Sequence, residues 1–434
     1  MLLNAADKAL WRLALPMIFS NITVPLLGLV DTAVIGHLDS PVYLGGVAVG
    51  ATATSFLFML LLFLRMSTTG LTAQAWGAKD PQRLARALAL ALGAGVLIIL
   101  LRLPLIDLAL HIVGGSEAVL EQARRFLEIR WLSAPASLAN LVLLGWLLGV
   151  QYARAPVILL VVGNLLNIVL DLWLVMGLRM NVQGAALATV TAEYATLIIG
   201  LLMAKRVLTL RGVSLAMLKN AWRGDLRRLL ALNRDIMLRS LLLQLCFGAL
   251  TVFGARLGSD IVAVNAVLMT MLTFTAYALD GFAYAVEAHS GQAYGARDGS
   301  QLLEVWRAAC RQSGMVALAF ALIYSLAGQY IIALLTSLPS LQQLADRYLI
   351  WQTILPVVGV WCYLLDGMFI GATRGAEMRN SMAVAAAGFA VTLLTLPVLG
   401  NHGLWLALAV FLALRGLSLA LIWRRHWRRG TWFS

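Results

Sequence analysis

The chain has 434 residues, of which 61% are hydrophobic and only 12% are charged, and its net charge is +13. Ordinary soluble domains carry roughly 25% charged residues, so a soluble fold could not cover this much apolar surface. Nucleic-acid binding is also excluded, because the basic residues stand in short segments between apolar stretches. The composition predicts a helical membrane protein that crosses the bilayer many times.

Twelve apolar stretches follow one another along the chain, most of them with the ~20 residues that are needed to cross a hydrocarbon core. Inside lipid every backbone polar group needs an internal partner, so each stretch is predicted to be a helix. Turn-forming residues separate the stretches. The predicted spans are 10–36, 45–69, 85–110, 119–150, 155–176, 182–206, 227–256, 262–290, 303–331, 342–371, 379–399 and 402–423.

The two halves of the chain are related by an internal repeat. The sequence Gln-Ala-Trp-Gly-Ala-Lys-Asp at 74–80 returns 218 positions later as Gln-Ala-Tyr-Gly-Ala-Arg-Asp at 292–298, and each copy follows an apolar span. We therefore expect an all-α polytopic membrane protein with twelve transmembrane helices in two pseudo-symmetric six-helix lobes, the N-lobe at 1–206 and the C-lobe at 227–434. The hydrophilic stretch 207–226 is predicted to be a cytoplasmic linker. Duplicated bundles of this kind are typical of secondary transporters.

Lysine and arginine residues indicate which side of the membrane each connection faces. They gather at both ends of the chain and in the even-numbered connections, whereas the odd-numbered connections are nearly bare, with Arg179 and Arg256 as the main exceptions. The excess of positive charge marks the cytoplasmic side. Both termini, including the basic tail, are predicted to be cytoplasmic.

Several carboxylates lie inside predicted spans, where each costs several kcal/mol unless it faces the interior of the bundle or water. Such residues usually have a function. They are Asp31, Asp171, Glu193, Asp280, Glu287 and Asp366.

Asp31 and Asp171 lie at a similar depth in the same half of the chain. Asn164, Asn167 and Asp171 follow i, i+3, i+7 spacing, which places them on one helix face, and Thr189 in the sixth span lies near that level. Burial raises the pKa of a carboxyl group, and a second carboxylate nearby raises it further, so such a pair can exchange a proton. The pattern predicts coupling to a proton gradient. A structural role, in which these side chains bond neighbouring helices, stays open.

Two prolines, Pro16 and Pro25, interrupt the span that carries Asp31. Proline removes a backbone donor and bends a helix. The bend is interpreted as a hinge that protonation of Asp31 could shift, with a static kink as the alternative.

Four segments of the chain together resemble one known family. They are Pro16 with Gly-Leu-Val-Asp-Thr-Ala-Val-Ile-Gly at 28–36, the doubled Gln-Ala-aromatic-Gly motif, Gly-Asn-Leu-Leu-Asn-Ile-Val-Leu-Asp at 163–171, and Asp-Gly-Met-Phe-Ile-Gly-Ala-Thr-Arg at 366–374. Over essentially its whole length the chain resembles the multidrug and toxic compound extrusion (MATE) family and, within it, the DinF-like branch.

The resemblance implies two lobes that flank a central cleft. It also implies efflux of amphipathic or cationic organic compounds by alternating access, in exchange for protons or sodium ions. The expected location of the protein is the bacterial cytoplasmic (inner) membrane. The protonation site of proton-coupled relatives corresponds to Asp31, and the proline that bends in them corresponds to Pro16. Their supporting polar residues correspond to Asn140, Asn167, Asp171 and Thr189.

Sodium-coupled relatives use acidic residues of the seventh and tenth spans. Here the seventh span is expected to offer no buried acid, because Asp235 stands near its cytoplasmic start, and Asp366 is about one turn away from the expected spacing. Proton coupling is therefore preferred over sodium coupling, with Glu193 and Asp366 as secondary candidates.

Other classes of function find less support. A lipid-linked saccharide flippase would need several basic residues deep in the N-lobe, and the chain offers mainly Arg65. An intramembrane enzyme is not expected, because the five histidines and three cysteines show no catalytic or metal-binding spacing, and a structural scaffold would not explain buried acids on a kinked helix. No glycine precedes any lysine, so there is no nucleotide-binding Gly-Lys motif. We expect a monomer in the lipid bilayer without cofactor, metal or nucleic acid, whose partners are protons and a small organic substrate.

Overall fold

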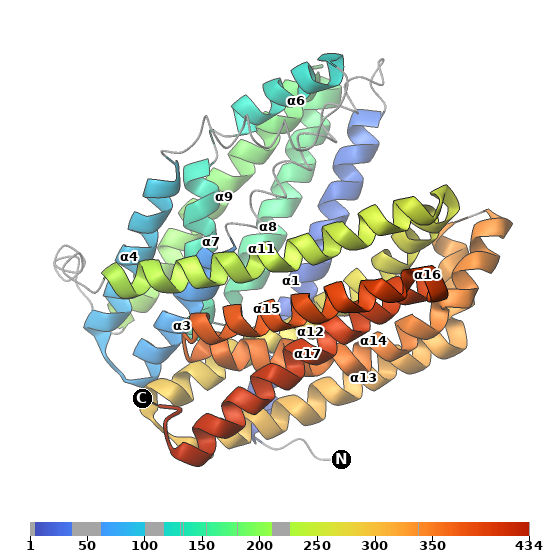
Figure 1. Cartoon of the computed structure of the whole chain (residues 1–434). Coiled ribbons are helices and arrows are strands. Elements are labelled where there is room, and N and C mark those ends of the chain that lie inside the picture. Colours follow the sequence, from blue (N-terminus) through green and yellow to red (C-terminus); the bar gives the residue numbers. More distant parts are fainter. Residues whose placement is uncertain are drawn as a thin grey trace. The chain divides into compact units, whose positions relative to one another are not determined.

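The computed structural model describes residues 5–36, 62–99, 117–130, 132, 134–152, 154–179, 181–210, 226–336 and 338–433 (Figure 1). Every regular element in these ranges is a helix. They are α1 (Ala5–Gly36), α3 (Phe63–Gly77), α4 (Pro81–Ile99), α6 (Glu117–Arg130), α7 (Ala134–Gly149), α8 (Arg154–Asp171), the π-helical turn η2 (Leu172–Gly177), α9 (Asn181–Leu210), α11 (Leu226–Leu257), α12 (Ser259–Ala296), α13 (Gly299–Leu335), α14 (Pro339–Gly371), α15 (Gly375–Thr392), the short turns η4 (Leu393–Thr395) and α16 (Leu396–Leu399), and α17 (Asn401–Arg429).

Eight of the described helical segments are long and apolar enough to cross a membrane, and they coincide with the fifth to twelfth predicted spans. The predicted fourth span, 119–150, falls on two helices, α6 and α7, which are bent by 57° to one another and together are long and apolar enough to cross a membrane. Pro135 stands in the first turn of α7. A proline is well tolerated in the first turn of a helix, where its missing N–H would have no intrahelical partner, and this favours the start of α7 at this point.

The chain divides into two compact units, residues 19–233 and residues 1–18 together with 234–434. The boundary near 233 lies close to the end of the predicted linker. The first 18 residues, however, pack with the second unit rather than with the N-terminal half, which the predicted lobes at 1–206 and 227–434 do not anticipate. Those lobe boundaries stay a prediction.

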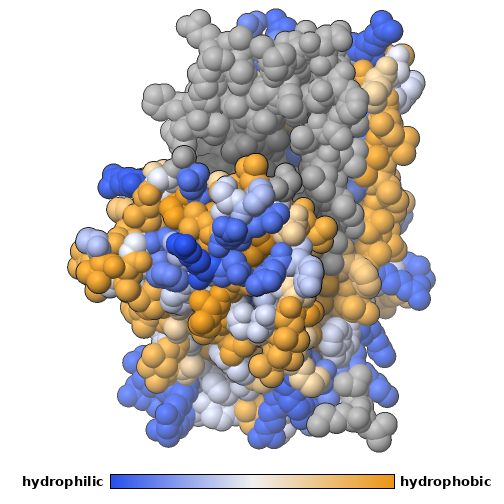
Figure 2. Space-filling model, turned by 90° about the vertical axis from the view of Figure 1, so that its right-hand side faces the viewer, coloured by the Kyte–Doolittle hydropathy of each residue, from blue (hydrophilic) through white to orange (hydrophobic). Residues whose placement is uncertain are grey.

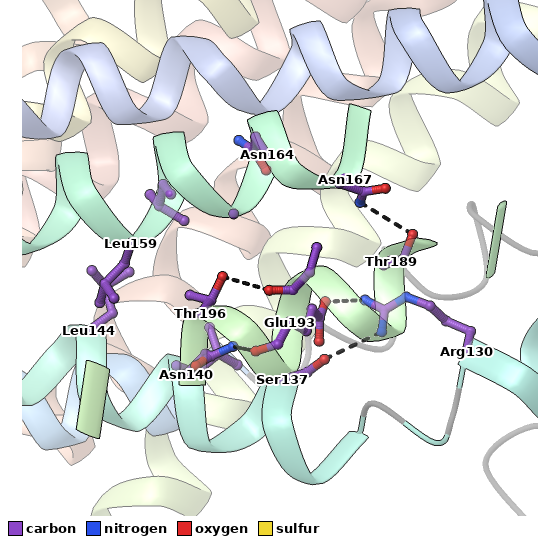
Figure 3. A pocket seen from close by; sticks show the side chains of 14 residues that line it. Arg130, Ser137, Asn140, Leu144, Leu159, Asn164, Asn167, Thr189, Glu193 and Thr196 are labelled. Carbon is purple, nitrogen blue, oxygen red and sulfur yellow. Dashed lines mark hydrogen bonds and ion pairs between the residues drawn. The ribbon is translucent and has the colours of Figure 1, made fainter. Parts of the chain in front are cut away.

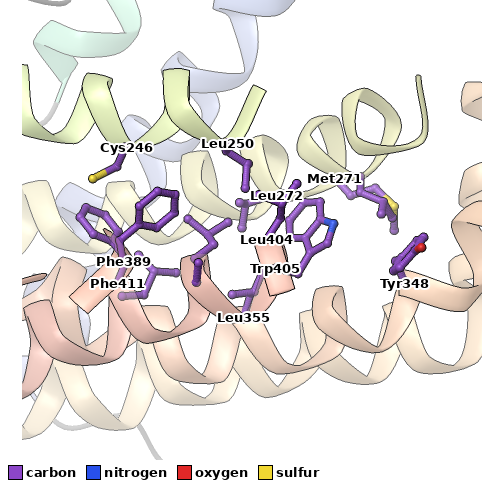
Figure 4. Packing of buried hydrophobic residues seen from close by; sticks show 14 of the residues in the cluster. Cys246, Leu250, Met271, Leu272, Tyr348, Leu355, Phe389, Leu404, Trp405 and Phe411 are labelled. Atoms are coloured by element: carbon purple, nitrogen blue, oxygen red, sulfur yellow. The ribbon is translucent and has the colours of Figure 1, made fainter. Parts of the chain in front are cut away.

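In the unit that contains residues 234–434, α14 is the central helix and packs with α12, α13, α15 and α17. Apolar side chains of α11 belong to the same buried cluster (Figure 4). Polar contacts add to this packing. Trp405 on α17 is fully buried and donates its indole N–H to Oδ1 of Asn265 at 3.1 Å. Asn265 and Asn401 exchange two amide hydrogen bonds of 2.9 and 2.8 Å. Such bonds hold helices together in lipid, where the hydrophobic effect between helices is absent.

Repeated glycines allow close helix contacts in both units. A Cβ atom at Gly145 of α7 would lie 2.5 Å from the carbonyl oxygen of Arg65 on α3, and one at Gly367 of α14 would lie 2.7 Å from that of Ala283 on α12. Gly145 and Gly367 are equivalent positions of the sequence repeat. The second and fourth helices of each repeat therefore meet through the same small residue.

The outer faces of the helices are apolar, as helices that face lipid require. Leu326, Tyr330 and Leu334 on α13 are 81, 75 and 87% exposed and follow one another at helical spacing. Apolar side chains cover much of the coloured surface in view in Figure 2.

Candidate functional site

A cavity of about 270 Å³ lies within the unit 19–233, between the end of α6 and the helices α7, α8 and α9 (Figure 3). It brings together five of the residues that the sequence singled out. Its lining comprises Arg130, Ser137, Asn140, Leu141, Leu144, Leu159, Leu160, Gly163, Asn164, Asn167, Thr189, Ala192, Glu193 and Thr196.

The predicted polar face of the fifth span is present on α8. Asn164 and Asn167 both line the cavity, and Asp171, which is 1% exposed, ends the helix one turn beyond Asn167. Asp171 itself is not part of the lining. The backbone then continues as the π-helical turn η2, a deviation that in other proteins frequently accompanies functional sites.

Asn167 on α8 is hydrogen-bonded to Thr189 on α9, the residue of the sixth span that the sequence predicts near its level. Its Nδ2 donates to Oγ1 of Thr189 at 3.3 Å, and the Thr189 hydroxyl donates to the carbonyl of Ala185 at 3.2 Å. Because the hydroxyl proton is used by Ala185, Thr189 must accept from the amide N–H. Oδ1 of Asn167 is buried and has no hydrogen-bond partner among the described residues.

Asn140 and Glu193 are joined on the opposite wall. Nδ2 of Asn140 donates to the backbone carbonyl of Glu193 at 3.1 Å, and its buried Oδ1 has no partner in the described part of the chain. The Glu193 carboxylate forms an ion pair of 2.6 Å with Arg130, which also donates to the Ser137 hydroxyl at 3.4 Å. The sequence reasoning left Glu193 without a partner and missed Arg130, although a cation inside a predicted span was a signal for it.

The side chain of Asp31 lies outside the described side chains, as does that of Pro25. The backbone of both residues belongs to α1, which continues as one helix through Pro16. The boundary between the two compact units falls within α1 after Ile18, two residues beyond Pro16. The roles of Asp31, Pro16 and Pro25 stay predictions.

Asp235 and Asp366 are two of the buried acids of the second unit. Asp366 on α14 is bonded to Arg239 of α11 at 2.6 Å and to Arg415 of α17. Asp235 on α11 is buried and bonds Arg379 at 2.5 Å. The expectation that the seventh span offers no buried acid is therefore wrong, because α15 supplies an arginine that makes the burial of Asp235 possible.

No group of three potential metal ligands occurs within the described ranges. The ion pairs that do occur there are each built from a carboxylate and at least one guanidinium or imidazole group, so their negative charge is already balanced by the protein.

Comparison with known proteins places the chain in a family. The sequence profile of the MatE family matches residues 16–173 and 236–399. The chain is also 86% identical to DNA damage-inducible protein F of Escherichia coli (strain K12) over 436 residues, which cover the whole chain and 95% of that protein. The chain belongs to the MatE family.

More distant MatE relatives agree with this. The chain is 23% identical to a probable multidrug resistance protein NorM of Acinetobacter baylyi, over 96% of this chain and 94% of that protein. The crystal structure of a MATE protein in the bent conformation superimposes with a TM-score of 0.84 at 23% identity, over 98% of this chain and 96% of that one. The predicted MATE-like fold of membrane-spanning helices is confirmed. One profile matches both halves of the chain, as an internal repeat requires.

Proposed function

We propose that this MatE protein is a secondary active antiporter, which exports amphipathic or cationic organic compounds in exchange for protons by alternating access. Asp31 is the proposed protonation site, supported by Asp171 and by the amide and hydroxyl groups of Asn167 and Thr189. The names of the NorM relatives refer to multidrug resistance, and this supports organic compounds as substrates.

The burial of Asp171 carries the proposal. Asp171 is 1% exposed and lies in the segment Arg154–Gly177, which is long and apolar enough to cross a membrane. A carboxylate in such surroundings needs a hydrogen-bond or charge partner, or takes up a proton. The neighbouring turn of α8 carries the Asn167–Thr189 hydrogen bond, and both of these residues line the cavity. A change in the protonation of Asp171 therefore acts one helical turn away from the cavity wall.

Sodium coupling through the second unit has less support, because two guanidinium groups already neutralise Asp366. A flippase for a lipid-linked saccharide also has less support. The cavity has one basic side chain in its lining, Arg130, and that side chain is paired with Glu193.

The proposed movement needs a flexible point in α1. Pro16 stands two residues before the place where the helix passes from one compact unit to the other, and the missing backbone donor weakens the helix at that point. We place the hinge there, with Pro25 as a second bend nearer to Asp31.

The test is ethidium transport in reconstituted vesicles under an imposed pH gradient or an imposed sodium gradient. We expect the pH gradient to suffice for the parent protein, and Asp31→Asn to abolish pH-driven transport while it still inserts as a monodisperse protein. Asp346→Asn, an exposed acid on α14, is the matched control and should transport normally. Sodium-driven transport that Asp31→Asn leaves unchanged would refute the proposed coupling site.

A further inference from the structure

The ion pair inside the cavity points to how a substrate is recognised. We propose that the Glu193 carboxylate is the counter-ion for the cationic head of the substrate, and that Arg130 holds this place while the cavity is empty. The inference rests on the proposed export of amphipathic cations and names the group that selects them.

The cavity has an apolar part and a polar part. Leu144 and Leu159 lie at one end in Figure 3 and Arg130 and Thr189 at the other, with Asn140, Thr196 and Glu193 between them. A ligand with an apolar body and a polar head matches this division, because each part then meets surroundings of its own kind.

The two asparagine side chains that bond across the cavity wall each keep an acceptor atom unused by the described residues. The amide nitrogens of Asn140 and Asn167 are used by the Glu193 carbonyl and the Thr189 hydroxyl, which leaves both Oδ1 atoms buried and without partners in the described chain. A buried acceptor without a donor costs about 1–3 kcal/mol. A ligand head that carries several N–H groups, such as a primary ammonium, would satisfy these oxygens, whereas an anionic head would not.

The charge of the head follows from Glu193. The ion pair is partly buried, because 10% of the Arg130 side chain and 23% of the Glu193 side chain are exposed. A carboxylate in an apolar helix is left uncompensated when it loses its cation. Arg130 supplies that cation at 2.6 Å. A substrate ammonium supplies it equally, so the two cations can be exchanged one for one without leaving the carboxylate alone.

The position of Arg130 allows its ion pair with Glu193 to break. It is the last residue of α6, where the partial negative charge of the helix end favours a cation. It also keeps its bond to Ser137 at 3.4 Å. Glu193, by contrast, lies in the middle of the long membrane-spanning helix α9, away from both of its ends.

The volume of the cavity limits the size of the ligand. About 270 Å³ corresponds to roughly nine volumes of ~30 Å³, the share of one water molecule in the liquid. Phenethylammonium, with a benzene ring and a primary ammonium, is a probe of this size. Its neutral counterpart, 2-phenylethanol, has nearly the same shape without the charge.

The test is equilibrium binding of these two probes to the full chain in lipid nanodiscs, without any gradient. We expect Glu193→Gln to weaken phenethylammonium binding by about 10- to 100-fold and to leave 2-phenylethanol binding nearly unchanged. Arg130→Gln removes the competing cation and should strengthen phenethylammonium binding. The double variant Glu193→Gln with Arg130→Gln carries neither charge and should show no preference for the ammonium.

The two single variants are expected to change the affinity for phenethylammonium in opposite directions, and this distinguishes substrate recognition from a structural role of the ion pair. A pair that only holds α6 to α9 predicts that both variants weaken both probes alike. Glu121→Gln, which breaks the exposed ion pair with Arg125 at 3.0 Å on the same helix α6, is the control and should bind as the parent does. Equal effects of the two single variants, or no phenethylammonium binding to the parent, would overturn the inference.

The assay also distinguishes this inference from the proposed function. Binding without a gradient does not depend on coupling, so Asp31→Asn should retain the preference for phenethylammonium. If pH-driven transport is normal and Glu193→Gln still prefers phenethylammonium to 2-phenylethanol, the inference about Glu193 is refuted and the proposed function is not. If the parent and the Glu193 and Arg130 variants bind the probes as expected but the parent shows no pH-driven transport, the proposed proton coupling is refuted and the inference is not.

Discussion

Replacement of Asp366 by asparagine tests how much the buried charges of the second unit depend on one carboxylate. Asp366 is bonded to both Arg239 and Arg415, and all three side chains are buried. The three groups together carry one net positive charge, and Asp366→Asn raises it to two. Removing one partner of a buried ion pair costs about 3–5 kcal/mol, and because this carboxylate serves two guanidinium groups, we expect a loss near the upper end.

Removal of an arginine should cost less. Arg415→Met leaves Asp366 paired with Arg239, so the cluster becomes neutral, and the loss should be that of a charged hydrogen bond, about 1–3 kcal/mol. The order of the two losses is therefore fixed by the charge balance. A cluster that acted only through its packing would give similar losses for both variants.

Thermal unfolding in detergent, followed by tryptophan fluorescence, measures these differences. In a unit of about 200 residues, each kcal/mol corresponds to a shift of roughly 2–4 °C, so Asp366→Asn should lower the midpoint by about 10 °C or more. Asp346→Asn on the same helix is the control, because Asp346 is exposed and its contact to Gln329 is 3.3 Å long; its effect should be within about 0.5 kcal/mol. An Asp366→Asn midpoint no lower than that of Asp346→Asn would refute the reasoning.

Further predictions concern packing and can be measured by the same thermal unfolding. Gly145→Ala should destabilise the protein by about 1–3 kcal/mol, because the new methyl group would meet the Arg65 carbonyl at 2.5 Å. Gly314→Ala should stabilise by up to ~1 kcal/mol, because no described atom outside the adjoining part of its own helix lies within 4 Å of its Cβ position. Changes of the same sign in the two variants would contradict this. Trp432→Ala should cost about 3–5 kcal/mol because this indole is 1% exposed, and Trp361→Ala should cost far less because Trp361 is 42% exposed; a tail that contributes nothing to stability would show no difference between them.

The sequence alone predicted the helices with good accuracy, because the constraint that produces them is local. Apolar length decides whether a stretch can cross the membrane, and lipid leaves the backbone no other way to satisfy its polar groups. The repeat was also visible in the motif at 74–80 and 292–298. Gly145 and Gly367, which lie 222 positions apart, both make close helix contacts in the structure. The break between α6 and α7 was missed because length and hydropathy outweighed the signal of Pro135.

Part of the candidate site was readable for the same reason. Helical spacing placed Asn164, Asn167 and Asp171 on one face of α8, and the level of Thr189 was close enough to suggest the contact that the structure contains. The spacing could not say that Asp171 stands beyond the cavity while Asn164 lines it. That difference depends on where α7 and α9 pack against α8.

Only the tertiary structure determined which charges meet. Glu193 pairs with Arg130 across 63 positions, and Asp366 with Arg415 across 49 and Arg239 across 127. The sequence shows that a carboxylate at membrane depth needs a partner, because its desolvation requires one. It does not show which arginine supplies the partner, because that depends on the rotation and height of two packed helices, and many cations of the chain would satisfy the charge equally well.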